Sequence, residues 1–111
     1  MSRTELSASH IADLAAIFKV LSEPNRLKIL LSMGLECTPV SAIIARTGLS
    51  QTNVSFHLRI MREAGLVKAE RNGAFIFYCL YDTTLLDMLG KMADWREAML
   101  EMQQTALAEA R

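Results

Sequence analysis

The sequence predicts a mainly α-helical domain with a small β-hairpin, and three observations support this fold class. Two short helical segments are joined by a tight turn around Gly48, and a long heptad pattern fills the C-terminal part of the chain. Between these parts, two strand-like runs flank Asn72 and Gly73, a strong short signal for a hairpin. Together these features predict a winged helix-turn-helix with about five helices. A chain of 111 residues has the size of one domain, so we expect a single domain over residues 1–111.

Apolar side chains at steps of three and four residues predict the first two helices. The first is expected from about Ser9 to Leu21, with an apolar stripe made of Ile11, Leu14, Phe18 and Leu21. Ser22 is expected to cap the second helix, which tolerates Pro24 in its first turn and ends near Gly34. The buried face of the second helix is expected to contain Leu27, Leu30 and Leu31.

The helix-turn-helix is expected over residues 38–65. Thr38 followed by Pro39 predicts a helix start, because the threonine oxygen can accept an orphan amide and proline needs no donor there. Gly48 ends this helix, Ser50 caps the next one, and Gly65 stops it. The apolar side chains expected to face the core from these two helices are Ile43, Ile44, Val54, Leu58 and Met61.

The pattern changes after Gly65 and predicts a two-stranded wing over residues 66–81. The runs from Leu66 to Glu70 and from Phe75 to Tyr81 are rich in strand-forming residues, with the turn between them. A final long helix is expected over residues 84–109. Its heptad seam consists of Leu85, Met88, Met92, Trp95, Met99, Met102 and Ala106. Because thioethers on a heptad seam usually pack against apolar neighbours, these methionines indicate a core or dimer interface and not a soft-metal site.

The net charge of zero conceals two oppositely charged regions. Residues 46–71 contain five basic and two acidic side chains, whereas residues 82–111 contain six acidic and three basic ones. The middle of the chain is therefore the candidate for phosphate contact. No apolar run is long enough to span a bilayer, and the first residues are too polar for a signal peptide, so we expect a cytoplasmic protein.

The helix that starts after Ser50 is the strongest functional signal in the sequence. Its apolar stripe turns a polar face outward, where short side chains in the first turn can reach base edges and arginines further along can contact phosphates. An ordinary amphipathic surface helix is the alternative, but the preceding helix and the following hairpin favour a recognition helix for double-stranded DNA. The expected DNA contacts are Ser50, Gln51, Thr52, Asn53, Ser55, His57, Arg59, Arg62, Arg71 and Asn72.

The stretches LSEPNRLKILLSM and LSQTNVSFHLRIMREAGLV, followed by a hairpin with Tyr78, resemble the ArsR/SmtB family of winged-helix repressors over nearly the whole chain. The resemblance implies a homodimeric repressor that leaves its operator when a metal ion, metalloid or oxidant is sensed. His57 matches the histidine of the family's recognition helix, whereas Phe56 stands where a basic or polar residue is common. The dimer interface is expected on the first and last helices, at Ile11, Leu14, Phe18, Leu85, Met88, Met92, Trp95, Met99 and Met102.

The residues at the family's usual metal sites depart from the pattern. The resemblance would place a Cys-x-Cys pair at Pro39 and Ser41, and neither can supply a thiolate. The site on the last helix would use residues near Asp82, Thr84, Asp94 and Glu97, yet no histidine follows His57. Because zinc prefers histidine and cysteine ligands, we expect no high-affinity metal site and no required cofactor.

Cys37 and Cys79 remain as candidate effector residues. Cys37 lies just before the helix-turn-helix and Cys79 in the second wing strand, and in a winged helix these two segments usually pair, so we expect the sulfurs to approach each other. Two thiolates suit a thiophilic metalloid or a reversible disulfide better than zinc, which needs about four ligands. The alternative is that both cysteines are small buried apolar residues.

The sequence contains no catalytic motif, so we expect a regulator and not an enzyme. The expected function is sequence-specific repression at an operator, released by an effector that reacts with thiols. Two alternatives stay open. One is a winged-helix regulator without an effector, controlled by its own level or by a protein partner. The other is a winged-helix interaction module that has lost its affinity for DNA.

Overall fold

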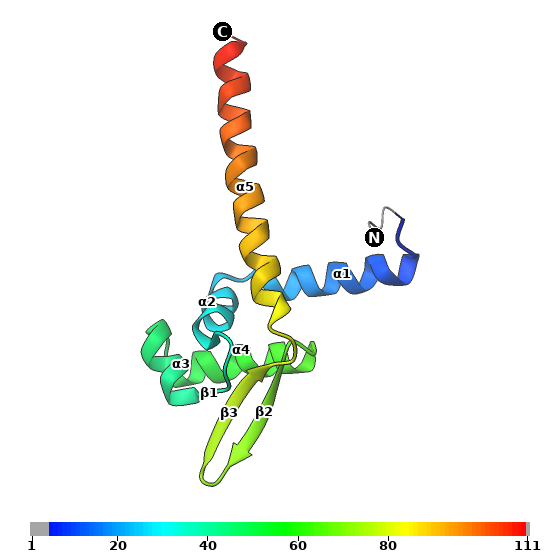
Figure 1. The fold of residues 1–111 in the computed structure, drawn as a ribbon. Helices are drawn as coiled ribbons and strands as arrows, with labels where there is room; N and C mark the ends of the chain where they lie inside the picture. Colours follow the sequence, from blue (N-terminus) through cyan, green and yellow to red (C-terminus); the bar gives the residue numbers. More distant parts are fainter. Residues whose placement is uncertain (1–4, 111) are drawn as a thin grey trace. The chain divides into compact units, whose positions relative to one another are not determined.

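The computed structural model describes residues 5–110 (Figure 1). The elements follow one another as α1 (Ala8–Leu21), α2 (Pro24–Met33), β1 (Thr38–Pro39), α3 (Val40–Thr47), α4 (Gln51–Glu63), β2 (Val67–Asn72), β3 (Phe75–Leu80) and α5 (Thr84–Glu109). The chain divides into a unit that ends at Tyr81 and a second unit that begins at Asp82. The five helices and the hairpin confirm the predicted fold class.

The core of the first unit lies where α2, α3 and α4 meet the base of the hairpin. Seven of its side chains are fully buried: Ile29, Leu30, Ile43, Val54, Leu58, Met61 and Val67. Each contributes on the order of 1.5–3 kcal/mol through its removal from water. Of the three residues predicted for the buried face of α2, Leu30 is fully buried and Leu27 half-buried, but Leu31 is 61% exposed and Ile29 is buried instead. The stripes predicted for α3 and α4 are confirmed at Ile43 and at the three apolar residues of α4.

Two predicted helix caps are wrong, for the same physical reason. The hydroxyl of Ser22 donates to the carbonyl of Lys19 at the end of α1, and Glu23 caps α2 by accepting the amide of Arg26. The hydroxyl of Thr38 is buried and donates to the carbonyls of Met33 and Glu36, at 3.1 and 3.0 Å. In both cases the hydroxyl binds carbonyls behind it in the chain, which are also left without partners when a helix ends.

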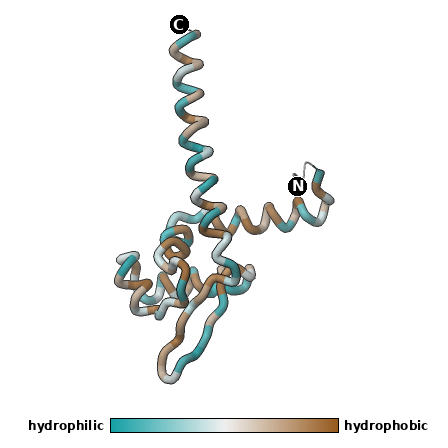
Figure 2. Tube along the Cα trace, in the orientation of Figure 1, coloured by the Kyte–Doolittle hydropathy of each residue, from teal (hydrophilic) through white to brown (hydrophobic). Residues whose placement is uncertain are grey.

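The sheet is antiparallel and has three strands in the order β1-β3-β2. Asn72 pairs with Phe75, so the two-residue turn of the hairpin is Gly73-Ala74 and not the predicted Asn72-Gly73. Gly73 has a φ of 65°. Among the described residues only glycines have a positive φ, so the second turn residue, Ala74, does not. A positive φ at the first turn position alone is the signature of a type II′ turn. Figure 2 shows that β2 is mostly hydrophilic and β3 mostly hydrophobic.

The second unit consists mainly of α5, which begins at Thr84 as predicted. The carboxylate of Asp82 accepts hydrogen bonds from the hydroxyl and the amide of Thr84, at 2.6 and 2.9 Å. These bonds favour the charged carboxylate, and they lower the pKa of Asp82 below its ordinary value. Among residues 5–110, no helix combines the length and the apolar character that crossing a membrane requires.

Candidate nucleic-acid interface

Helix α4 presents a mostly polar face to solvent because most of its apolar side chains pack into the core. Val54, Leu58 and Met61 have no exposed surface, and they lie three and four residues apart on one side of the helix. The side chains on the opposite side are exposed: Gln51, Thr52, Ser55, Phe56, Arg59 and Arg62. This set, called the α4 outer face below, contains five of the ten predicted DNA contacts.

The α4 outer face and the sheet together form an open concavity of about 590 Å³. All six residues of the α4 outer face line it, and Tyr78 of β3 lines it from the wing. The wing strand is therefore adjacent to the helix, and one surface carries hydrogen-bonding, aromatic and cationic groups. Tyr78 is not among the contacts predicted from the sequence. The alternation of residues along β3 puts Tyr78 on the same face as the buried Leu80, and this pattern could have indicated its place.

Phe56 and Arg59 occupy the centre of the α4 outer face. The guanidinium of Arg59 lies 5.9 Å from the centroid of the Phe56 ring, within the range of a cation–π contact. Phe56 is 48% exposed. An aromatic ring held in this way on a recognition helix can make apolar contact with a thymine methyl group, while the arginine stays available for phosphate or guanine.

The wing carries two further predicted contacts at its tip. Arg71 and Asn72 are exposed residues of β2, paired with Ile76 and Phe75 of β3. Phe75 is 66% exposed and Ile76 40% exposed, so the tip also presents apolar surface. This combination of a cation and an aromatic side chain suits contact with the backbone or minor groove of a duplex.

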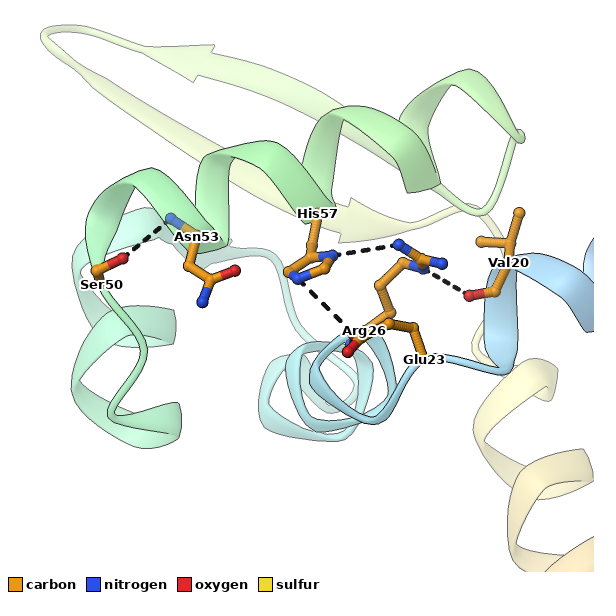
Figure 3. Close-up of polar contacts among 6 residues, drawn as sticks. All are labelled: Val20, Glu23, Arg26, Ser50, Asn53 and His57. Carbon is orange, nitrogen blue, oxygen red and sulfur yellow. Dashed lines mark hydrogen bonds and ion pairs between the residues drawn. The ribbon is translucent and has the colours of Figure 1, made fainter.

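His57 does not belong to this surface, so its predicted contact with DNA does not fit the structure. Its ring is 6% exposed and faces α2, where Arg26 Nη1 donates to His57 Nδ1 at 3.3 Å (Figure 3). The other ring nitrogen, Nε2, lies 3.7 Å from a carboxylate oxygen of Glu23. Because arginine can only donate, Nδ1 must be the acceptor, and a neutral ring then carries its proton on Nε2 toward Glu23. His57 thus anchors the recognition helix to α2.

Ser50 and Asn53 lie at the N-terminus of α4, where the predicted cap is confirmed. The hydroxyl of Ser50 accepts the amide of Asn53 at 3.1 Å (Figure 3). Gly48 ends α3 in the left-handed conformation, with a φ of 73°. Since this turn and the cap fix where α4 begins, they also fix which residues of its first turn point outward.

Cys37 and Cys79 form a disulfide, and their Cα atoms are 4.3 Å apart. The pairing of Thr38 with Tyr78 places the two cysteines opposite each other at the end of the β1–β3 ladder. Cys37 is exposed and lines an open concavity of about 550 Å³, whereas Cys79 is 4% exposed. The prediction that the two sulfurs approach each other is therefore confirmed.

Glu70 of β2 is a third group at this position that the sequence analysis missed. One oxygen of its carboxylate and the two sulfurs all lie within 4.8 Å of one another. The register explains this, because Lys68 pairs with Cys79 and Glu70 with Phe77, two residues along on the same face of the sheet. Lys68 Nζ lies 3.4 Å from the Glu70 carboxylate.

Comparison with known proteins connects this surface to a family. A family model described as a helix-turn-helix domain matches residues 21–70. The HTH-type transcriptional regulator NmtR of Mycobacterium tuberculosis is 36% identical over 84 residues, which cover 76% of this chain and 70% of NmtR. The transcriptional repressor SmtB homolog of Synechocystis is 29% identical over 89 residues, covering 80% of this chain and 67% of the homolog.

A solved structure adds the fold. The homodimeric winged helix-turn-helix DNA-binding domain of a possible ArsR-family transcriptional regulator from Mycobacterium bovis has a TM-score of 0.70 and 27% identity. The match covers 85% of this chain and 90% of that domain. The chain belongs to the ArsR/SmtB family of winged helix-turn-helix transcriptional repressors. Reduced HlyU from Vibrio cholerae is similar as well, with a TM-score of 0.69, 25% identity, and coverage of 76% of this chain and 92% of HlyU.

Membership of the ArsR/SmtB family settles the class of the protein, because this is a family of DNA-binding regulators and not of enzymes. The thiol positions that the family resemblance indicates are occupied here by Pro39, the last residue of β1, and by Ser41, exposed in the first turn of α3. The two cysteines of this chain instead lie at the β1–β3 ladder, where they form the disulfide.

Both helices predicted to form the ArsR/SmtB dimer interface carry exposed apolar side chains. In α1, Ile11 is 58%, Leu14 43% and Phe18 50% exposed. No residue of α5 is buried, and its seam residues Met88, Met92, Trp95 and Met102 are 48–62% exposed. Leu85 and Met99 are half-buried. Such stripes are typical of surfaces that another chain covers.

Proposed function

We propose that this protein represses transcription by binding as a homodimer to a palindromic operator, with the α4 outer face in the major groove and the wing on the adjacent backbone. The observation that carries this proposal is the concavity formed by that face and Tyr78, on a domain of the ArsR/SmtB family. Arg59, Arg62 and Arg71 supply cations beside it. The apolar stripes of α1 and α5 supply the dimer contacts.

Operator DNA in bacterial relatives lies in the cytoplasm, which is where we expect the protein to act. The cytoplasm keeps most thiols reduced, so the Cys37–Cys79 disulfide represents the oxidised state of the protein there. We propose that an effector that reacts with these thiols releases the operator. With hydrogen peroxide, the two thiols give up two electrons and two protons to form the disulfide, and the peroxide is reduced to two water molecules.

The DNA-binding proposal is tested by fluorescence anisotropy with the reduced protein and the duplex upstream of its own gene. Gln51→Ala or Ser55→Ala is expected to weaken operator binding by about 1–3 kcal/mol and to leave binding to a scrambled duplex unchanged, because base contacts carry specificity. Arg71→Ala is expected to weaken binding to both duplexes. It is also expected to reduce the slope of log affinity against log salt concentration by about one. Gln103→Ala in α5 is the matched control. A triple alanine variant at Gln51, Ser55 and Arg59 that keeps operator affinity would refute the proposal.

The effector proposal is tested with the Cys37→Ser, Cys79→Ser double variant. This variant is expected to bind the operator as the reduced parent does and to stay bound when an oxidant is added, since neither side chain can then form the disulfide. The parent protein is expected to dissociate under the same treatment. A double variant that still responds to the oxidant would place the effector site elsewhere.

A further inference from the structure

We propose that reduced Cys37 and Cys79, together with Glu70, form a binding site for a thiophilic divalent cation of the zinc and cadmium class. The proposed function assigns an oxidant to these thiols, whereas the site proposed here binds a divalent cation with the same thiols and adds a ligand from the wing. It rests on the proposed function only in assigning regulation to these cysteines. The binding itself requires neither DNA nor an operator.

The number of ligands is the first argument. Two thiolates alone hold zinc poorly, and for that reason the sequence argues against a metal. The carboxylate of Glu70 brings the number of ligands to three, all with their donor atoms within 4.8 Å of one another. At a tetrahedral centre, donors about 2.0–2.3 Å from the ion lie about 3.3–3.8 Å from one another. The two sulfurs can reach this separation once the disulfide is reduced.

The register of the sheet is the second argument, because it brings the three ligands together at the β1–β3–β2 sheet. Cys79 is in β3 and Glu70 is in β2, whereas Cys37 directly precedes β1, so two ligands come from strands and one from the residue next to the third strand. Paired residues share a face of the sheet, and all three side chains therefore project to the same side. The exposed Cys37 borders an open concavity, which gives a cation access from solvent.

The charge of the site is the third argument. When a divalent cation binds, each thiol loses one proton, and the two thiolates with the carboxylate carry three negative charges. The cation leaves a net charge of minus one, which Lys68, 3.4 Å from the carboxylate, brings to zero. Before binding, Lys68 and Glu70 form only an exposed ion pair, which is weak enough to be rearranged. A water molecule completes four-coordination.

The consequence for regulation follows from where the ligands lie. The disulfide joins only β1 to β3, whereas a bound cation also holds β2, the strand that carries Arg71 and Asn72 to the tip of the wing. Oxidation and metal binding therefore use the same two sulfurs but exclude each other, and they constrain the wing differently.

The test is a titration of the reduced full-length chain with cadmium chloride in the absence of DNA, followed by the ultraviolet charge-transfer band of cadmium thiolate. We expect one cadmium ion per chain. Glu70→Gln is expected to keep the band at saturation but to lose affinity by about tenfold or more, because even an outer-shell partner of a metal typically changes affinity by that much. Glu36→Gln, next to Cys37 in sequence but outside the cluster, is the matched control and is expected to bind like the parent.

Two further measurements keep the result decisive. The oxidised protein is expected to show no band, and so is Cys37→Ser. Cys37 is exposed, so this substitution leaves the core unchanged, and the fold is checked by circular dichroism. Equal cadmium affinity in the parent and in Glu70→Gln, or no thiolate band in the reduced parent, would overturn the proposal. Since no DNA is present, loss of operator recognition leaves this result unaffected, and a failed titration leaves the repressor function standing.

Discussion

At the scale of single residues, Arg26 helps to position the DNA-binding surface, a role that no sequence motif had indicated. Its Nε donates to the carbonyl of Val20 at 2.6 Å, and its Nη1 donates to His57 (Figure 3). Val20 lies near the end of α1, Arg26 in α2 and His57 in α4. One side chain thus ties together three helices, including the one that presents the α4 outer face.

Arg26→Met is expected to destabilise the protein by about 1–3 kcal/mol, because it leaves a carbonyl and a ring nitrogen without their charged donor. Methionine keeps most of the apolar stem, so lost packing contributes little. The free energy of unfolding is measured by urea titration. Lys28→Met, an exposed position of the same helix, is the control and is expected to change stability by less than about 0.5 kcal/mol. Equal effects of the two variants would show that the Arg26 hydrogen bonds are not important.

At the scale of elements, the position of the hairpin turn determines which residues of β2 and β3 lie opposite each other. If Asn72 and Gly73 formed the turn, Arg71 would pair with Ala74 and Cys79 would lie opposite Leu66. The observed turn at Gly73-Ala74 places Cys79 opposite Lys68 instead, and brings Glu70 near the sulfurs. The local Asn-Gly signal cannot distinguish these registers, because both keep the same residues on the same face of the sheet.

Substitutions in the turn distinguish the two registers. Gly73→Ala is expected to cost about 1 kcal/mol of folding stability, because an L-residue is strained at a φ of 65°. Asn72→Ala is expected to cost less than about 0.5 kcal/mol, since Asn72 is an ordinary strand residue here. In the alternative turn both residues would need positive φ, and the two variants would then be equally destabilised in urea titrations.

The helices, the core and the candidate site differ in how far the sequence could predict them. Helix positions and the core of α3 and α4 were predictable, because apolar periodicity reflects which face must leave water. The exposed polar side of α4 followed from the same pattern. His57 and Glu70 were not predictable, since their places depend on how α2 packs against α4 and on which residues pair across the hairpin. Ser22 and Thr38 were assigned to the wrong helix ends, because a hydroxyl can bind groups on either side of it in the chain.

At the scale of the whole molecule, two helices carry apolar surfaces that are not buried in the core of the chain. The first is the stripe of α1, and the second is the heptad seam of α5, where no residue is buried. A palindromic operator presents two half-sites about one helical turn apart. A chain with one recognition helix therefore binds both half-sites only when it is joined to a second copy, and this raises its affinity for the operator. Repression and dimerisation are therefore expected to fail together.

Met92→Lys is expected to convert the dimer to a monomer, because it places an unpaired charge in the α5 seam, where the parent has a half-exposed thioether. Gln104→Lys adds the same charge on the side of the heptad opposite the seam, and this control is expected to remain dimeric. Sedimentation velocity at matched concentrations gives the oligomeric state, and anisotropy gives operator affinity. The lysine at position 92 is expected to weaken operator binding while a single half-site is bound as before. A dimer that persists in Met92→Lys would mean that the two chains associate through another surface.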